Sequence, residues 1–109
     1  MNLTDRYTKL PDGNIALELT DGQSTPLGKI VGHLLYHNRE LYSLCPSPIG
    51  CPSTGGQHSL RIRGSMDDVK AFIDLMIDFY SKYKSLSLVE EGIDALWNIK
   101  KMLIGKTGL

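Results

Sequence analysis

The sequence predicts an α+β fold, in which an antiparallel β-meander of about four to five strands in the N-terminal half packs against two C-terminal α-helices. Three observations support this class. Apolar and polar residues alternate in short runs before residue 64, apolar residues recur at helical spacing after residue 65, and clusters of glycine and proline separate the early runs. We expect residues 1–109 to form one domain, with residues 1–4 and 105–109 frayed at its ends.

One predicted strand covers residues 14–19, where Ile15, Leu17 and Leu19 share one face. Residues 6–10 precede it across a Pro-Asp-Gly turn, and we expect them to pair with it. The Asp-Gly dipeptide at 21–22 is typical of a tight hairpin turn.

Residues 28–44 are predicted to form a second hairpin. Two runs rich in β-forming residues flank Asn38 and Arg39, and asparagine tolerates the positive φ that such a turn often requires. Residues 45–56 contain three prolines that lack the donors of a sheet, so we expect an irregular loop there. Alternation resumes at residues 58–64, which are predicted as the last strand.

Two helices are predicted after Gly64. Ser65 suits the N-cap of the first helix, and acidic residues in its first turn complement the helix dipole. Its apolar stripe comprises Val69, Phe72, Ile73, Met76, Tyr80 and Tyr83. The second helix is predicted from Leu88 to about Ile104, with an apolar side made of Val89, Ile93, Leu96, Trp97, Leu103 and Ile104.

Composition and charge narrow the function classes. Apolar residues make up 41% of the chain and charged residues 22%, which is typical of a folded globular protein. Twelve basic residues balance twelve acidic residues, so the formal net charge is zero. This balance argues against general nucleic-acid binding, and it leaves little electrostatic repulsion between copies of the chain.

The sequence also predicts a compartment. No apolar run approaches the length of about 20 residues that a membrane-spanning helix needs, and the first residues lack the apolar core of a secretory signal. We therefore expect a cytoplasmic protein without membrane contact, whose two cysteines are thiols.

One candidate site is a zinc centre formed by His33, His37, Cys45 and Cys51. The two histidines are four residues apart on a predicted strand and therefore share a face. The two cysteines are six positions apart, which is wider than the usual zinc knuckle, so we expect no cofactor and keep zinc as a weaker alternative. A redox pair is less favoured still, because no helix begins nearby to lower a thiol pKa.

A second candidate is an anion site in the segment 45–59, "CPSPIGCPSTGGQHS". Its hydroxyls and its glycine N–H groups suit a phosphate, and arginine matches phosphate with two parallel hydrogen bonds. Neither a Walker motif nor a Gly-x-Gly-x-x-Gly motif is present. The predicted ligand-binding residues are Ser53, Thr54, Gly55, Gly56, His58, Arg61 and Arg63.

A third candidate is an interface on the last helix. Its apolar side is broad, and Lys100 falls near the middle, where an ammonium must reach solvent or find a carboxylate. The predicted interface residues are Trp97, Ile99, Lys100 and Met102.

These observations rank three functions. The first is a small non-catalytic regulatory or protein-interaction module that acts as a homo-oligomer, or with another protein as its partner. The second is the binding or sequestering of a small anionic, nucleotide-like ligand by residues 45–59 with Arg61 and Arg63, and the third is a zinc-binding module. An enzyme is less favoured than a binding function, because no nucleophile with its base and orienting group is recognisable, but catalytic groups from distant positions are not visible in a sequence.

Overall fold

The structure of the chain is a computed structural model that describes residues 6–83, 85, 87 and 89–107, of which residues 51–54 and 106–107 are described through their backbone alone. The described strands are β1 (Tyr7–Lys9), β2 (Ile15–Glu18), β3 (Asp21–Gly22), β4 (Ile49–Thr54) and β5 (Gln57–Gly64). The described helices are α1 (Pro26–His37), α2 (Arg39–Ser43), α3 (Met66–Ser81) and α4 (Val89–Thr107). An antiparallel sheet in the N-terminal half with two helices at the C-terminal end confirms the predicted α+β class.

Strand β5 is the centre of the sheet. It pairs with β4 along one edge and with β2 and then β3 along the other, while β1 pairs with the outer edge of β2. All of these pairings are antiparallel. The Leu19 N–H donates to the Leu60 carbonyl at 2.7 Å, which holds the link between β2 and β3 against β5. The predicted pairing of residues 6–10 with 14–19 and the predicted strand at 58–64 are both confirmed.

Residues 28–44 form helices, so the predicted hairpin is wrong. Helix α1 begins at a Thr25 N-cap, whose hydroxyl accepts from the Gly28 N–H at 3.0 Å, and Pro26 occupies its first position. Apolar spacing of three and four residues then buries one side of the helix, namely Leu27, Ile30, Val31 and Leu34. The residues expected to form a hairpin turn at 21–22 instead form β3.

Residues 49–54 form strand β4, which corrects the prediction of an irregular loop throughout residues 45–56. Proline is tolerated on an edge strand or at a bulge, where its missing N–H breaks no ladder bond. Both conditions hold for Pro52, because β4 is an edge strand and its register with β5 shifts between Cys51 and Thr54. Residues 45–48 remain outside helices and strands.

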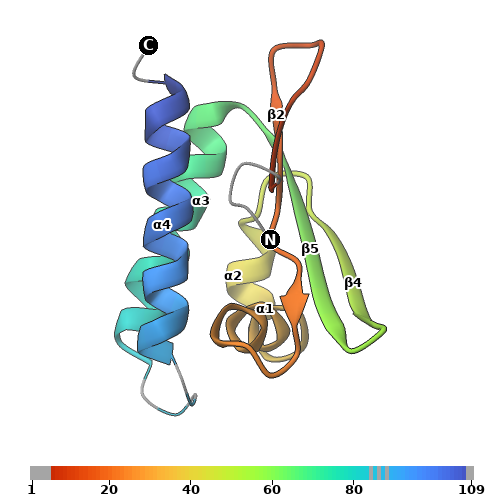
Figure 1. Cartoon of the computed structure of the whole chain (residues 1–109), viewed down its shortest axis with the longest axis vertical. Coiled ribbons are helices and arrows are strands. Elements are labelled where there is room, and N and C mark those ends of the chain that lie inside the picture. The colour runs from red at the N-terminus through yellow and green to blue at the C-terminus, as the bar shows by residue number, and fades with distance from the viewer. Residues whose placement is uncertain (1–5, 84, 86, 88, 108–109) are drawn as a thin grey trace.

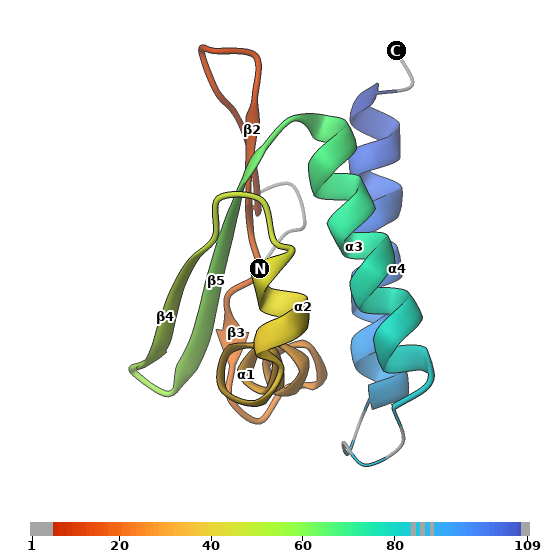
Figure 2. The ribbon, with the colours of Figure 1, turned by 180° about the vertical axis from the view of Figure 1, so that it is seen from behind.

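The helices lie on one side of the sheet (Figures 1 and 2). Helices α3 and α4 run side by side, and α1, which both views show nearly end-on, lies between α4 and the lower part of the sheet. The predicted stripe of α3 faces this core, as do the inward residues of the sheet and of α1. The fully buried large side chains are Leu17, Leu19, Ile30, Leu34, Leu60, Ile62, Phe72, Ile73, Met76, Tyr80, Leu96 and Ile99.

The start of α3 agrees with the prediction from the sequence, whereas α4 extends beyond its predicted end. The Ser65 hydroxyl accepts from the Asp68 N–H at 3.1 Å, which confirms the predicted N-cap of α3. Helix α4 continues to Thr107, so the segment predicted to fray from residue 105 begins as helix. None of the described helices is long and apolar enough to cross a lipid bilayer.

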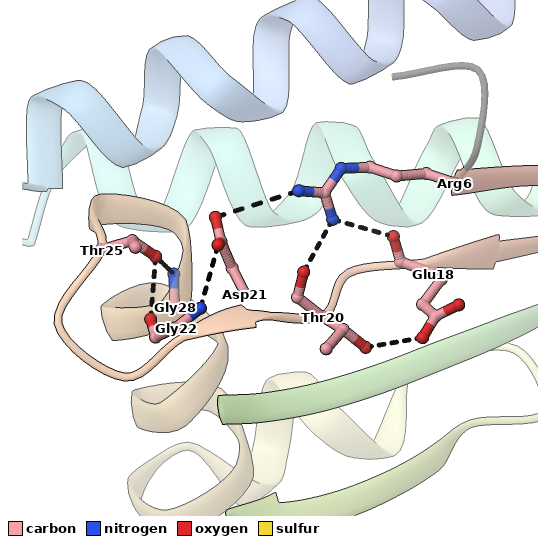
Figure 3. A network of polar contacts seen from close by, with 7 residues as sticks. All are labelled: Arg6, Glu18, Thr20, Asp21, Gly22, Thr25 and Gly28. Atoms are coloured by element: carbon pink, nitrogen blue, oxygen red, sulfur yellow. Dashed lines mark hydrogen bonds and ion pairs between the residues drawn. The ribbon is translucent and has the colours of Figure 1, made fainter. Parts of the chain in front are cut away.

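Arg6 joins the end of β2 to the start of β3 (Figure 3). Its guanidinium donates to the carbonyl oxygens of Glu18 at 3.3 Å and Thr20 at 2.9 Å, and it lies 3.9 Å from the carboxylate of Asp21. The side chain is only 8% exposed, so its charge is compensated mainly by these three oxygen-bearing groups. The sequence alone did not single out this buried arginine.

Candidate functional site

The structure does not bring the predicted anion-binding residues together. Gly55 and Gly56 form the turn between β4 and β5, with φ of 61° and 77°. At about 3.3 Å per residue along β5, Arg63 lies roughly 23 Å from Gly56. Side chains alternate between the two faces of β5, so His58 lies on the same face as the buried Leu60 and faces α1. Arg61 and Arg63 lie on the opposite face of the sheet. The side chains of Ser53 and Thr54 lie outside the described part of the chain.

Both arginines of the predicted anion site already have a carboxylate partner. Arg61 lies 3.9 Å from Glu18, and Arg63 lies 3.7 Å from Asp12. These pairs are exposed on the outer face of the sheet, where an ion pair contributes little stability. They nevertheless neutralise the two positive charges that the anion-binding hypothesis requires.

The predicted zinc ligands are also separated. His33 and His37 share a face, but on helix α1 rather than on a strand. Cys45 is a buried thiol in the core, and burial raises its pKa to about 12, so it holds its proton at neutral pH. The side chain of Cys51 is outside the described residues. No three ligating side chains meet at a metal-sized site within the part of the chain that the structure describes.

The predicted interface residues on α4 differ in their exposure. Ile99 is fully buried in the core, so it is unavailable to a partner, and Met102 packs against the core. Lys100 forms an ion pair with Asp74 of α3, and its ammonium lies 4.7 Å from the ring centre of Trp97. The ammonium of Lys100 is thus paired with a carboxylate, as its position on the apolar side of α4 requires. Trp97, at 42% exposed, is the main surface residue of the predicted set.

A different apolar surface lies between α2 and α3, and we call it the α2–α3 groove. It is a hollow of about 370 Å³ lined by Leu41, Leu75, Asp78, Phe79, Lys82 and Tyr83. Leu75 is 42% exposed and Phe79 is 37% exposed. The rings of Phe79 and Tyr83 stack with centres 5.7 Å apart, which makes one wall of the groove flat and rigid.

The rim of the α2–α3 groove carries one charge of each sign. The Lys82 ammonium lies 3.5 Å from the Asp78 carboxylate, one turn away on α3. Leu44, which is 61% exposed, caps the C-terminal end of α2 and adds an apolar side chain close in sequence to Leu41. The groove therefore combines an apolar floor with a mixed-charge rim.

A second hollow, of about 240 Å³, lies between α1 and the end of the sheet. We call it the histidine hollow, because all three histidines of the chain line it. Its lining residues are Gln23, Lys29, Gly32, His33, Tyr36, His37 and His58. They come from the β3–α1 connection, from α1 and from β5, so the sequence could not group them without the fold.

His33 is held in place by two tyrosines, Tyr80 in the last turn of α3 and Tyr83 just after that helix. Its Nδ1 lies 2.9 Å from the Tyr80 hydroxyl and its Nε2 lies 3.1 Å from the Tyr83 hydroxyl. A neutral imidazole has one donor and one acceptor, so one hydroxyl donates to the ring and the other accepts from it. Burial, and to a smaller extent the charge of His37, lowers the pKa of His33. This arrangement favours the neutral ring.

We expect the stability of the protein to fall as the pH falls through the range in which His33 titrates. The unfolded chain has the higher His33 pKa, near the ordinary value of 6.5. Below that pH the unfolded state therefore binds more protons than the folded state, and the free energy of unfolding decreases. Thermal unfolding between about pH 7.5 and about pH 5.5 measures this loss, and His33→Gln should make it smaller. The His37→Gln variant should keep most of the loss, and an equal slope in wild type and His33→Gln would contradict the assignment.

Comparison with protein-family models, with curated proteins and with solved structures gives no match.

Proposed function

We propose that the protein is a small protein-interaction module that associates with a second copy of itself through the α2–α3 groove. The observation that carries this proposal is the apolar floor of the groove, where Leu75 and Phe79 are both more than a third exposed. Contiguous exposed apolar surface with a polar rim is typical of protein-binding sites. Trp97 is equally exposed, but Lys100 covers part of its ring.

The charges of the groove favour a second copy over another occupant. In a two-fold symmetric dimer the same patch faces itself, so a rim with one carboxylate and one ammonium is complementary to its own copy. Asp78 and Lys82 pair within each protomer, so the rim presents no uncompensated charge to its copy. The formal net charge of zero adds no long-range repulsion between the two copies.

We place this association in the cytoplasm and assign it a regulatory rather than a chemical role. The free thiol of Cys45 supports a reducing compartment. Its burial and raised pKa make it a packing residue, because reactive cysteines are partly exposed and have lowered pKa values.

The test compares two charged substitutions at equally exposed apolar residues. Leu75→Glu places a charge on the floor of the groove, and Trp97→Glu places one on α4. We expect Leu75→Glu to raise the dissociation constant of the dimer about a hundredfold, because a desolvated charge at the centre of an interface is highly unfavourable. We expect Trp97→Glu to leave it within about threefold of wild type. Sedimentation equilibrium measures both, and circular dichroism checks that each variant is folded.

Two results would overturn the proposal. A wild-type chain that stays monomeric at high micromolar concentration has no such dimer. A dimer that Trp97→Glu dissociates and Leu75→Glu does not would place the interface on α4, where the sequence first predicted it.

A further inference from the structure

The histidine hollow is separate from the α2–α3 groove and has a different chemistry. Lys29 is the only lysine, arginine or carboxylate-bearing residue among those that line it. None of the ion pairs found among the described residues involves Lys29. The hollow therefore carries an uncompensated positive charge, unlike Arg61 and Arg63 on the outer face of the sheet.

The packing of His58 against α1 depends on the absence of a side chain at Gly32. Gly32 is buried in α1, and a Cβ at this residue would lie 2.6 Å from Cδ2 and 2.7 Å from Nε2 of His58. Real Cβ atoms essentially never approach ring atoms so closely, so the imidazole fits against the helix only because residue 32 is glycine. Tyr36 contacts the same ring edge-on, with centres 5.6 Å apart. His58 is thus packed between β5 and α1.

One polar atom of the hollow lacks a partner. Nδ1 of His58 is buried and has no hydrogen bond within the described part of the protein. A buried polar atom without a hydrogen bond is unfavourable, and a bound group that completes the hydrogen bond is one explanation for such an atom. This atom belongs to His58, which lines the hollow together with Lys29.

The geometry of His33 argues against a metal ion as that bound group. Both of its ring nitrogens already contact the hydroxyls of Tyr80 and Tyr83, so neither has a lone pair free for coordination. Only His37 and His58 remain as imidazole ligands in the hollow, and no carboxylate lines it. Two imidazoles are fewer than the three protein ligands that a zinc site needs.

We propose that the histidine hollow binds a phosphate group, either as free phosphate or as the head of a small phosphorylated metabolite. A phosphate accepts several hydrogen bonds at once, and this hollow offers the ammonium of Lys29, the imidazoles of His37 and His58, the amide of Gln23 and the hydroxyl of Tyr36. Its volume of about 240 Å³ lies below the range of drug-sized pockets and suits a small ligand. The rings of Tyr36 and the histidines supply an apolar wall for the remainder of such a molecule.

The test is isothermal titration calorimetry of the full chain with inorganic phosphate and, separately, with glycerol 3-phosphate. Lys29→Gln and His37→Gln each remove one donor from the rim of the hollow, where these side chains are partly or largely exposed, so the fold is retained. We expect each variant to weaken binding of the tighter probe by about tenfold, which is the scale of one charge-assisted hydrogen bond. The control is Lys101→Gln on α4, which is exposed and outside the hollow and should bind as wild type does.

The two probes distinguish the two sources of the phosphate group. Tighter binding of glycerol 3-phosphate assigns the hollow to a phosphorylated metabolite, and equal or tighter binding of inorganic phosphate assigns it to the free anion. Absence of saturable binding for both probes overturns the proposal. So does binding that Lys101→Gln weakens as much as Lys29→Gln, because that result shows only general attraction to positive charge. Stoichiometric Zn²⁺ binding that His37→Gln abolishes, without phosphate binding, would assign the hollow to a metal instead.

Discussion

Replacing Gly28 with alanine should lower the free energy of unfolding by about 3 kcal/mol, although alanine is the best helix former. A Cβ at this position would lie 1.8 Å from the carbonyl oxygen of Gly22 and 2.9 Å from the hydroxyl of Thr25. The first of these is a backbone atom of β3, so the clash cannot be relieved by rotating a side chain. The added methyl group therefore has to push α1 away from the sheet and weaken the N-cap that Thr25 provides (Figure 3). Urea unfolding followed by circular dichroism measures the loss.

The matched control is Gly105→Ala. Gly105 also lies in a helix, but its added Cβ would meet no atom within 4 Å. The substitution should raise the free energy of unfolding by about 0.5 kcal/mol, because it reduces the backbone freedom of the unfolded chain. If both variants were stabilised alike, the close approach of α1 to β3 would be wrong.

Replacing Arg6 with alanine should cost about 3 kcal/mol of stability. The substitution leaves the carbonyl oxygens of Glu18 and Thr20 without the donor that they have in the wild type, and it leaves Asp21 without its cation. Because the Arg6 side chain is only 8% exposed, its replacement by alanine also leaves a cavity at the end of the sheet. Thermal and urea unfolding of the variant measure the effect.

Arg61→Ala is the control for this substitution. Arg61 also pairs with a carboxylate, that of Glu18, at the same 3.9 Å, but its side chain is 57% exposed. We expect its removal to change the free energy of unfolding by less than about 0.5 kcal/mol. Equal effects of the two substitutions would mean that the burial of Arg6 does not decide its contribution.

The sequence correctly predicted those helices and strands in which the capping residues and the apolar spacing match the burial seen in the fold. Ser65 is both a favourable N-cap and the observed one, and the apolar stripe after it is the buried face of α3. The alternation around Leu17 and around Leu60 likewise matched a sheet that is buried on one face only. In such segments propensity, periodicity and packing indicate the same structure.

The prediction failed where two local signals compete. Between residues 28 and 44, β-branched and aromatic residues favour a strand, whereas Thr25 and Pro26 mark the start of a helix. The helix forms because the spacing of Ile30, Val31 and Leu34 allows it to pack on β5 and α4. At Pro52 the sequence predicts a loop, but the structure has strand β4. A proline excludes a central strand but not an edge strand with a shifted register.

The candidate sites depended on contacts that a sequence does not contain. The histidine hollow needs Gly32 beside His58, and these residues come from different elements. The α2–α3 groove needs Leu41 beside Leu75 and Phe79, which lie in helices separated by a hairpin. The sequence predicts a surplus apolar surface on α4, where Trp97 is exposed, but it does not indicate the exposed Leu75 and Phe79 of α3.

The central place of β5 has a consequence for synthesis on the ribosome. The chain emerges from its N-terminus, so β2, β3 and β4 are made before the strand that pairs with all three of them. Until β5 emerges, only the pairing of β1 with β2 and the helices α1 and α2 can form within the nascent chain, and neither a short hairpin nor a short isolated helix is stable alone. The sheet therefore cannot form before residues 57–64 leave the exit tunnel, and until then the unpaired strands are exposed to chaperones or to other nascent chains.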